Sequence, residues 1–364
     1  MSDLNTLAPD NRDLSMFPGE YGLPFLGKTV EFVKDTLAMC NKHYEKYGPV
    51  SRLDMVKNQR VLMCLGPEFN EATLFDPKGN FSVAGGYASS LGGLYPDGML
   101  TRDDAKHKRT RRASQPAFKN DALKTYVDML IPIQERRIQD LPINEEFIFY
   151  DNIQKTLMDV AARVFIGLDE LSPEAKKLGH LFSEINEGLI TPLPYDLPFL
   201  QFRKSLKARE ELRQFFIENI PKRRGSNGLD MFTRYCNAKD EDGEYLDDID
   251  IDGHIAFLLF AAFDTTTSAL TNILYYLGKN PEWQDKVRNE IFSVTNEMPT
   301  FEDLAEMNLT EYVFQETLRF YPSVMVLNRR TTRDVNVAGY DIPANTVVMI
   351  LSLIHISEPT RRIT

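Results

Sequence analysis

An acidic residue and two hydroxyls interrupt the most apolar stretch of the chain. The segment Ala261–Thr266 reads AAFDTT and follows a run of apolar residues that begins near Ile255. Polar groups inside an apolar helix are costly unless they have partners or a purpose. Threonine hydroxyls bond backbone carbonyls three or four residues earlier and can bend a helix, so this segment could open a groove for a small ligand and a water. The alternative is a polar stripe that faces a solvated crevice.

A second group of residues lies in Asp104–Phe118, which reads DAKHKRTRRASQPAF. His107 and Arg111 are four residues apart, so they share one helix face and could bind an anionic group together. With its lysines and other arginines, the segment 106–112 forms a basic patch in an acidic protein. A solvated helix face, a nucleic-acid site and a docking surface for an acidic partner all remain possible interpretations. The nucleic-acid interpretation is the weakest, because no aromatic residues alternate with the charges.

Two further motifs combine arginine with acidic residues. Glu316 and Arg319 lie three residues apart in ETLRFYP, on a helix predicted over Thr310–Tyr321, and can pair on one face. Taken alone, this motif indicates only a surface ion pair. Arg329 precedes Asp334 in a loop-like segment, where its guanidinium could neutralise a carboxylate ligand.

The elements that must position these residues are mainly helical between about Asp103 and Met298. The AAFDTT segment falls in a helix predicted over Asp250–Gly278, which is hydrophobic all round and is therefore expected to be buried. Asn280 and Pro281 predict the start of the next helix, with asparagine as its cap. The predicted breaks between helices, which contain proline or glycine, are 192–198 and 225–228.

Extended structure is expected near both ends of the chain. Phe17–Gly27 reads FPGEYGLPFLG and predicts an extended arm, and Thr29–Tyr47 predicts one amphipathic helix. Val50–Leu65 predicts two strands, and Val335–Ile350 predicts short strands and turns. The fold class is therefore mainly α with a small β portion.

Composition excludes several classes of protein. The chain has 364 residues, of which 43% are hydrophobic, so it can bury a sizeable core. Its net charge of -11 argues against binding to nucleic acid or to an anionic membrane. We expect neither a signal peptide nor a membrane anchor, because no run of 18 apolar residues occurs and the start is polar. The unpaired cysteines Cys40, Cys64 and Cys236 fit a reducing compartment, so we expect a cytoplasmic protein without disulfides.

In order and spacing, these segments resemble the cytochrome P450 family from Phe17 to about Ile350. FPGEYGLPFLG resembles the family's proline-rich arm, and NRRTTRDVNVAGYDIPANT resembles the strand segment after the E-x-x-R helix. The resemblance implies one cytochrome P450-like domain of the soluble bacterial type over residues 1–350. A glycine is usual in the family where Ala262 stands, and this change could narrow the oxygen groove.

The resemblance also implies roles for individual residues. The acid and alcohol that deliver protons to bound oxygen would be Asp264 and Thr265. The residues that would hold haem b, mainly through its propionates, are His107, Arg111, Arg329 and Ala261. Those that would brace the haem-side core are Glu316 and Arg319. Candidates for contact with a lipophilic substrate are Phe257, Phe260, Val324, Met325 and Val326.

The family's F-x-x-G-x-x-x-C-x-G loop, whose cysteine ligates the haem iron, is expected after Ile350 and is missing. The sequence there is LSLIHISEPTRRIT, and we expect residues 351–364 to be a non-native tail. The three cysteines that the chain does contain stand in the wrong contexts to replace it. We therefore expect the chain to be truncated, inactive, and poorly folded or prone to aggregate.

The activity implied for the complete protein is insertion of one oxygen atom of O2 into a lipophilic small molecule such as a terpenoid, fatty acid or steroid. Electrons would come from a ferredoxin- or flavodoxin-type donor that docks on the basic patch. Two other classes stay open: a helical small-molecule-binding protein without metal, and a helical prenyl-diphosphate cyclase that uses magnesium. The cyclase motif D-D-x-x-D needs an acid where Ile251 stands.

Overall fold

The computed structural model describes residues 7–10, 13–56 and 59–351. They form two compact units, and each is described by itself. The first comprises Met1–Asp104, Ile185–Lys207 and Val324–Thr364, and the second comprises Ala105–Glu184 and Ala208–Ser323.

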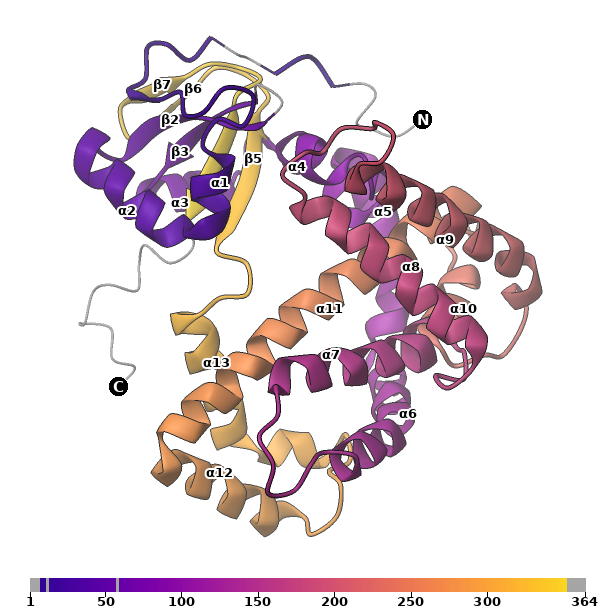
Figure 1. Cartoon of the computed structure of the whole chain (residues 1–364). Coiled ribbons are helices and arrows are strands. Elements are labelled where there is room, and N and C mark those ends of the chain that lie inside the picture. The colour runs from indigo at the N-terminus through magenta and orange to yellow at the C-terminus, as the bar shows by residue number, and fades with distance from the viewer. Residues whose placement is uncertain (1–6, 11–12, 57–58, 352–364) are drawn as a thin grey trace. The chain divides into compact units, whose positions relative to one another are not determined.

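The first unit is built on a six-stranded sheet (Figure 1). Its strands, in spatial order, are β1 (Gly19–Glu20), β2 (Val50–Asp54), β3 (Arg60–Cys64), β8 (Val347–Leu351), β5 (Val326–Thr331) and β4 (Phe81–Ser82). A separate two-stranded sheet joins β6 (Val335–Val337) to β7 (Tyr340–Ile342). The strands predicted from Val50–Leu65 and Val335–Ile350 are thus confirmed.

Strand β8 explains why the sheet holds together. All five of its residues, VVMIL, are buried, as expected for a central strand that is covered on both faces. Val348 and Ile350 pack into one hydrophobic cluster, whereas Val347, Met349 and Leu351 pack into another. This alternation is the two-residue period of a strand with a core on each side. Leu351, the first residue of the expected tail, belongs to β8 and is paired with Val326, and residues 352–364 lie outside the described part of the chain.

Four short α-helices accompany this sheet: α1 (Thr29–Lys34), α2 (Thr36–Tyr47), α3 (Pro67–Leu74) and α4 (Val83–Leu91). The prediction of a single helix over Thr29–Tyr47 is wrong, because Asp35 divides it. Asp35 has an extended backbone, with φ -158°, and its carboxylate accepts a hydrogen bond from the Ala38 amide at 2.9 Å. An aspartate that caps a new helix competes with continuation of the previous one.

The second unit is helical (Figure 1). The helices that lie wholly or mainly in it are α5 (Asp104–Ser114), α6 (Asn120–Gln139), α7 (Phe149–Val160), α8 (Pro173–Ile190), α9 (Gln201–Arg223), α10 (Met231–Cys236), α11 (Asp248–Lys279), α12 (Pro281–Val294) and α13 (Asn308–Phe320). A π-helical turn, Ala161–Ile166, continues α7. Both predicted breaks, 192–198 and 225–228, fall between helices, which confirms the mainly helical class.

Helix α11 departs from its predicted environment in its second half. Residues 250–257 are buried, but from Phe260 onward most residues are half-buried or exposed, so the expectation of burial along the whole helix is wrong. Among the described residues, α11 is the one helix with the length and hydropathy to cross a membrane, a test that a core helix also passes. Its first half carries the buried polar residues Asp250, Asp252 and His254.

The junction between α11 and α12 also differs from prediction. Asn280 occupies the N-cap position of α12, but its side chain makes no capping bond there. Its amide instead donates to the Tyr276 carbonyl at 2.8 Å, at the end of α11. The residue type therefore marked the junction correctly, while the hydrogen bond satisfies the preceding helix, whose last carbonyls lack partners.

Candidate functional site

The predicted site residues divide between the two units. Arg329, Val324, Met325 and Val326 belong to the first unit, and the remainder belong to the second. The residues of each unit are therefore described separately.

The acid–hydroxyl segment lies in the middle of α11. The Thr265 hydroxyl donates to the Ala261 carbonyl at 2.7 Å, and the Thr267 hydroxyl donates to the Phe263 carbonyl at 2.9 Å. The Thr265 bond is the backward bond predicted for AAFDTT, and Thr267, just after that segment, makes the same kind of bond. The Ser323 hydroxyl, which follows α13, donates to the Thr265 carbonyl at 2.8 Å. Thr265 is thus held both by its own turn and by the segment after α13.

Asp264 precedes this threonine and is set apart by its surroundings. Solvent reaches the carboxyl group, yet protein atoms crowd around it, and this partial desolvation raises the pKa of Asp264. A carboxyl group with a raised pKa keeps its proton at a higher pH than an ordinary aspartate does. Such a group, next to a hydroxyl, is suited to handing on protons.

His107 and Arg111 lie one turn apart on α5, as their spacing predicted. His107 is half-buried, and Arg111 is exposed at the surface of the second unit. A guanidinium and an imidazole on one helix face offer several donors to a single carboxylate. Their assignment to haem propionates stays a prediction.

The basic patch on α5 is less basic than its sequence indicates. The Arg109 guanidinium binds the Asp240 carboxylate with contacts of 2.8 and 2.7 Å, and Arg112 pairs with Glu241. Desolvation opposes ionisation of Asp240, but hydrogen bonds from Arg109 and from two backbone amides outweigh it and lower the pKa of Asp240, and the same pair raises the pKa of Arg109. An acidic hairpin far along the chain therefore neutralises two of the patch's charges, which local sequence could not show.

Arg329 and Arg330 lie next to each other on β5, but only Arg330 is buried and ion-paired. The Arg329 guanidinium donates to the Asn328 carbonyl at 2.8 Å, and no described carboxylate pairs with it. The adjacent Arg330 is buried and pairs with Asp10 at 3.1 Å. Helix α4 approaches this strand closely at Gly86, where an added Cβ would come within 2.7 Å of the Arg329 backbone. Arg329 thus retains donors for a ligand, whereas Arg330 is part of the fold.

The predicted pairing of Glu316 with Arg319 is confirmed on α13. Two parallel hydrogen bonds of 2.6 Å join the guanidinium to the carboxylate, and the guanidinium also stacks over Phe320 at 4.2 Å. Arg319 lowers the pKa of Glu316. Both side chains are well exposed, at 55% for Glu316 and 40% for Arg319.

The five predicted substrate-contact residues differ in how deeply they are buried. Phe257 is only 8% exposed and lies in the core, with its ring 5.9 Å from that of Phe260. In the first unit, Met325 and Val326 pack against the hydrophobic cluster around Met349. Burial of this kind indicates a core role for Phe257, Met325 and Val326. Of the five candidates, Val324 is exposed, and Phe260 is half-buried, as Met325 and Val326 are.

The cysteines of the chain are poorly suited to ligate a haem iron. Cys40, Cys64 and Cys236 are buried and free. Burial raises the pKa of Cys40 to about 11 and that of Cys236 to about 12, and it raises the pKa of Cys64 further. Each thiol would have to lose its proton to ligate a haem iron, and burial opposes that ionisation. Over the described residues, no group of three or more histidine, cysteine or acidic side chains could hold a metal ion.

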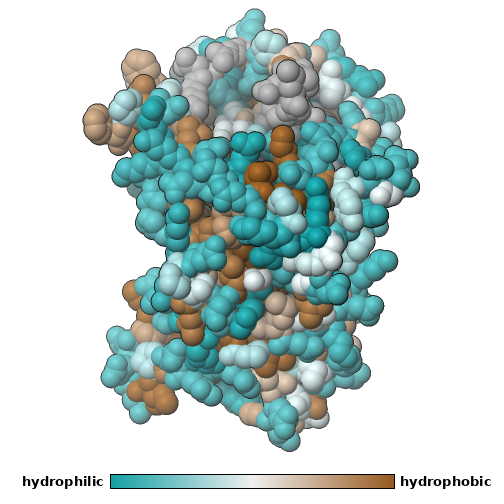
Figure 2. Space-filling model, turned by 90° about the vertical axis from the view of Figure 1, so that its right-hand side faces the viewer, coloured by the Kyte–Doolittle hydropathy of each residue, from teal (hydrophilic) through white to brown (hydrophobic). Residues whose placement is uncertain are grey.

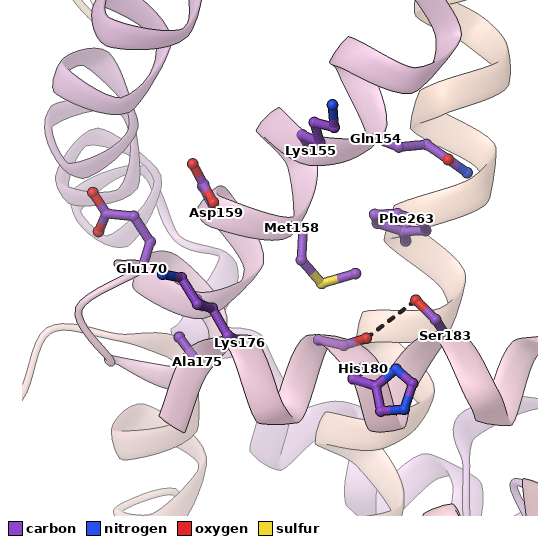
Figure 3. Close-up of a pocket in the computed structure, with 12 residues that line it drawn as sticks. Gln154, Lys155, Met158, Asp159, Glu170, Ala175, Lys176, His180, Ser183 and Phe263 are labelled. Carbon is purple, nitrogen blue, oxygen red and sulfur yellow. Dashed lines mark hydrogen bonds between the residues drawn. The ribbon is translucent and has the colours of Figure 1, made fainter. Parts of the chain in front are cut away.

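Sequence reasoning missed a groove in the second unit (Figure 3). It has a volume of about 370 Å³ and lies between α7, α8 and the Phe263 side chain of α11. Its residues form no motif, since they come from separate helices with ordinary amphipathic patterns. The π-helical turn that follows α7 contributes Ala162 to its lining.

Comparison with known proteins places the chain in a family. The family model described as Cytochrome P450 matches residues 17–359. A protein of Mycobacterium tuberculosis described as a cytochrome P450 is 29% identical, with 94% of this chain and 70% of the relative covered. Taxane 13-alpha-hydroxylase of Taxus cuspidata is 27% identical, with 90% and 70% covered. The solved structure of cyanobacterial CYP120A1 with retinoic acid bound matches with a TM-score of 0.84 and 26% identity, over 94% of this chain and 78% of that chain. The chain therefore belongs to the cytochrome P450 family of haem monooxygenases.

Proposed function

We propose that this chain builds the oxygen-side and propionate-side walls of a P450 monooxygenase, with Asp264 and Thr265 as its acid and alcohol. Haem iron, O2 and a redox partner follow from membership of the family. The observation that carries the proposal is the Thr265 hydroxyl, bonded to the Ala261 carbonyl beside an acid with a raised pKa.

The chemistry of these groups suits proton delivery and carboxylate binding. A hydroxyl that donates to a carbonyl keeps its lone pairs, so Thr265 can accept a hydrogen bond from a bound group. Asp264 can then resupply a proton from the solvent side. His107, Arg111 and Arg329 are the residues we assign to the propionates of haem b, because imidazole N–H and guanidinium groups donate hydrogen bonds to carboxylates.

A lipophilic, terpenoid-type substrate is the class we favour. Support comes from relatives that are named for oxidation of taxanes and of beta-amyrin, and from the retinoic acid bound to CYP120A1. In the second unit, Phe260 is the side chain we assign to its contact surface, since it is only half-buried.

For electrons, we propose a ferredoxin- or flavodoxin-type donor in the cytoplasm. The docking surface we assign to it is narrower than the whole segment 106–112, because Arg109 and Arg112 are already paired. Lys108 is exposed and carries charge that is assigned neither to an ion pair nor to a propionate. Rim charges of this kind affect the association rate more than the affinity.

We further propose that the chain, as its sequence stands, does not form a thiolate-ligated haem and is inactive. The test is a carbon-monoxide difference spectrum of the reduced protein, expressed with haem available. We expect no strongly red-shifted Soret band, because the three cysteines are buried thiols. If the band forms and is lost in Cys40→Ala, Cys64→Ala or Cys236→Ala, that cysteine is the ligand and the proposal is wrong. A chain that folds stably and takes up no haem at all would favour the metal-free binding protein instead.

A further inference from the structure

The groove beside Phe263 has an apolar floor and a polar rim (Figure 3). Met158 points into the middle of the groove, with Phe263 on one side and Asp159 and Glu170 on the other (Figure 3). Ala162, from the π-helical turn, adds to the apolar lining. A pocket of about 370 Å³ lies at the lower end of the range for small-molecule sites in proteins.

The floor continues inward as a narrow apolar space. A second cavity of about 20 Å³ lies behind the groove, shares Met158 and Phe263 with it, and reaches Phe182 and Leu259. That volume suits a single small apolar group. Methionine is flexible and adapts to irregular gaps, so rotation of Met158 can join the two spaces. Gly179 keeps this region tight, since an added Cβ would come within 3.2 Å of the Met158 sulfur.

The charges around the groove favour an anion. Its two carboxylates are already bound: Arg136 and Arg137 hold Asp159 at 2.9 and 2.7 Å, and Arg136 also holds Glu170 at 2.8 Å. Arg163 contributes a third guanidinium to this cluster. Three arginines therefore face two acids, which leaves an excess of positive charge at this end.

Two lysines increase that excess. Lys155 and Lys176 line the groove, are exposed, and have no ion-pair partner among the described residues, and His180 and Ser183 add polar groups beside them. A groove that is cationic at its rim and apolar at its floor stands out in a protein with a net charge of -11. This combination matches an amphipathic carboxylate.

We propose that this groove binds a medium-chain fatty acid, with the alkyl chain on Met158, Ala162 and Phe263 and the carboxylate beside Lys176. The inference does not depend on haem or on the proposed activity. The site contacts the turn of α11 that carries Asp264 and Thr265, but from another side of the helix, because successive residues are rotated by about 100°.

The test is calorimetric titration of the full chain with decanoate. We expect saturable binding that is at least about fivefold tighter than binding of decanol or of decylammonium, because only the carboxylate meets the lysines. Lys176→Glu should weaken decanoate binding about tenfold, since it replaces an attraction with a repulsion. Lys177→Glu is the matched control, because the neighbouring lysine faces Glu211 at 3.8 Å and does not line the groove.

A second variant separates this groove from any other apolar surface. Ser183→Phe places a ring in the groove from an exposed position and should abolish decanoate binding, while urea unfolding shows the fold to be intact. Unsaturable binding, equal binding of decanol, or unchanged binding in both Lys176→Glu and Ser183→Phe would overturn the proposal. A loss of affinity in Lys177→Glu as large as that in Lys176→Glu would also overturn it.

Discussion

The two halves of helix α11 hold their polar groups in opposite ways. In the first half, the buried Asp252 accepts hydrogen bonds from the two terminal guanidinium nitrogens of Arg209 on α9, at 3.0 and 2.7 Å. In the second half, Thr265 and Thr267 bond to carbonyls of their own helix, and Asp264 faces solvent. A charge that needs a partner from another helix fixes where the helix lies. Hydroxyls that are satisfied within the helix leave its outer face available for a ligand.

The first half of α11 therefore stabilises the position of the helix, whereas the second half offers a surface to a ligand. A buried ion pair adds little net stability, but it strongly penalises any arrangement that breaks it. The second half needs no such partner, so its surface can stay open without an unsatisfied polar group. Apolar side chains are exposed in this part of the second unit, and Figure 2 shows that brown, apolar patches interrupt a mainly hydrophilic surface.

The largest expected loss of stability comes from breaking the buried ion pair in the first half of α11. Arg209→Ala leaves the buried Asp252 carboxylate without its main partner and should lower the free energy of unfolding by about 3–5 kcal/mol. Urea denaturation, followed by circular dichroism, measures the loss. Arg213→Ala is the control, because Arg213 lies 3.9 Å from the same carboxylate but is 43% exposed, and it should cost less than about 1 kcal/mol. Equal losses in the two variants would contradict the distinction.

A second test asks whether Phe257 is a core residue or part of a ligand-binding surface. Because its side chain is buried, Phe257→Ala should leave a cavity and lower the free energy of unfolding by about 3 kcal/mol. Phe260→Ala should cost clearly less, since Phe260 is half-buried on the same helix. If the two substitutions cost the same, the boundary between the two halves does not fall between these residues.

Much of this arrangement could be predicted from the sequence because the relevant forces are local. The alternation over Val335–Ile350 predicted short strands there, and the threonines of AAFDTT predicted a backward hydroxyl bond. The pairing of Glu316 with Arg319 required only helical spacing. In each case, the interacting atoms lie within one element or follow from its period.

The features that sequence reasoning missed depend on distant parts of the chain. Asp240 and Glu241 neutralise Arg109 and Arg112 across more than 120 residues of sequence, so the charge of the α5 patch could not be read from α5 alone. Asp35 looked like an ordinary residue of one helix, although it caps the next. The groove beside Phe263 forms only when three helices pack, and no single segment carries its signature.

A smaller, pH-dependent change in stability is expected from Asp264 in the second half of α11. The pKa of Asp264 is raised in the folded chain, so ionising this carboxyl group costs more in the folded state than in the unfolded state. Below its ordinary pKa of 3.8, both states are protonated, and Asp264→Asn should change nothing. As the pH rises through the folded pKa, the wild-type protein should lose stability relative to Asp264→Asn. The difference should stay under about 1 kcal/mol, because solvent reaches the carboxyl group. Urea unfolding of both proteins, in acid and near neutrality, measures it, and a difference of the opposite sign would show that a hydrogen-bond donor stabilises the carboxylate.

The smallest expected loss of stability comes from an exposed ion pair that has the same bidentate geometry as the buried one. Glu316–Arg319 and Asp252–Arg209 are both bidentate pairs, but the first has side chains 55% and 40% exposed, whereas the second has side chains 4% and 9% exposed. Glu316→Gln should therefore lower the free energy of unfolding by only about 0.5 kcal/mol, a loss that salt should reduce further. Because Arg319 lowers the pKa of Glu316, this contribution should be present above the ordinary pKa of 4.5 and should disappear as the pH falls through the folded value. A loss as large as that of Arg209→Ala would mean that further protein covers this face of α13 in solution, and the pair would then act as buried support, as Arg209 and Asp252 do.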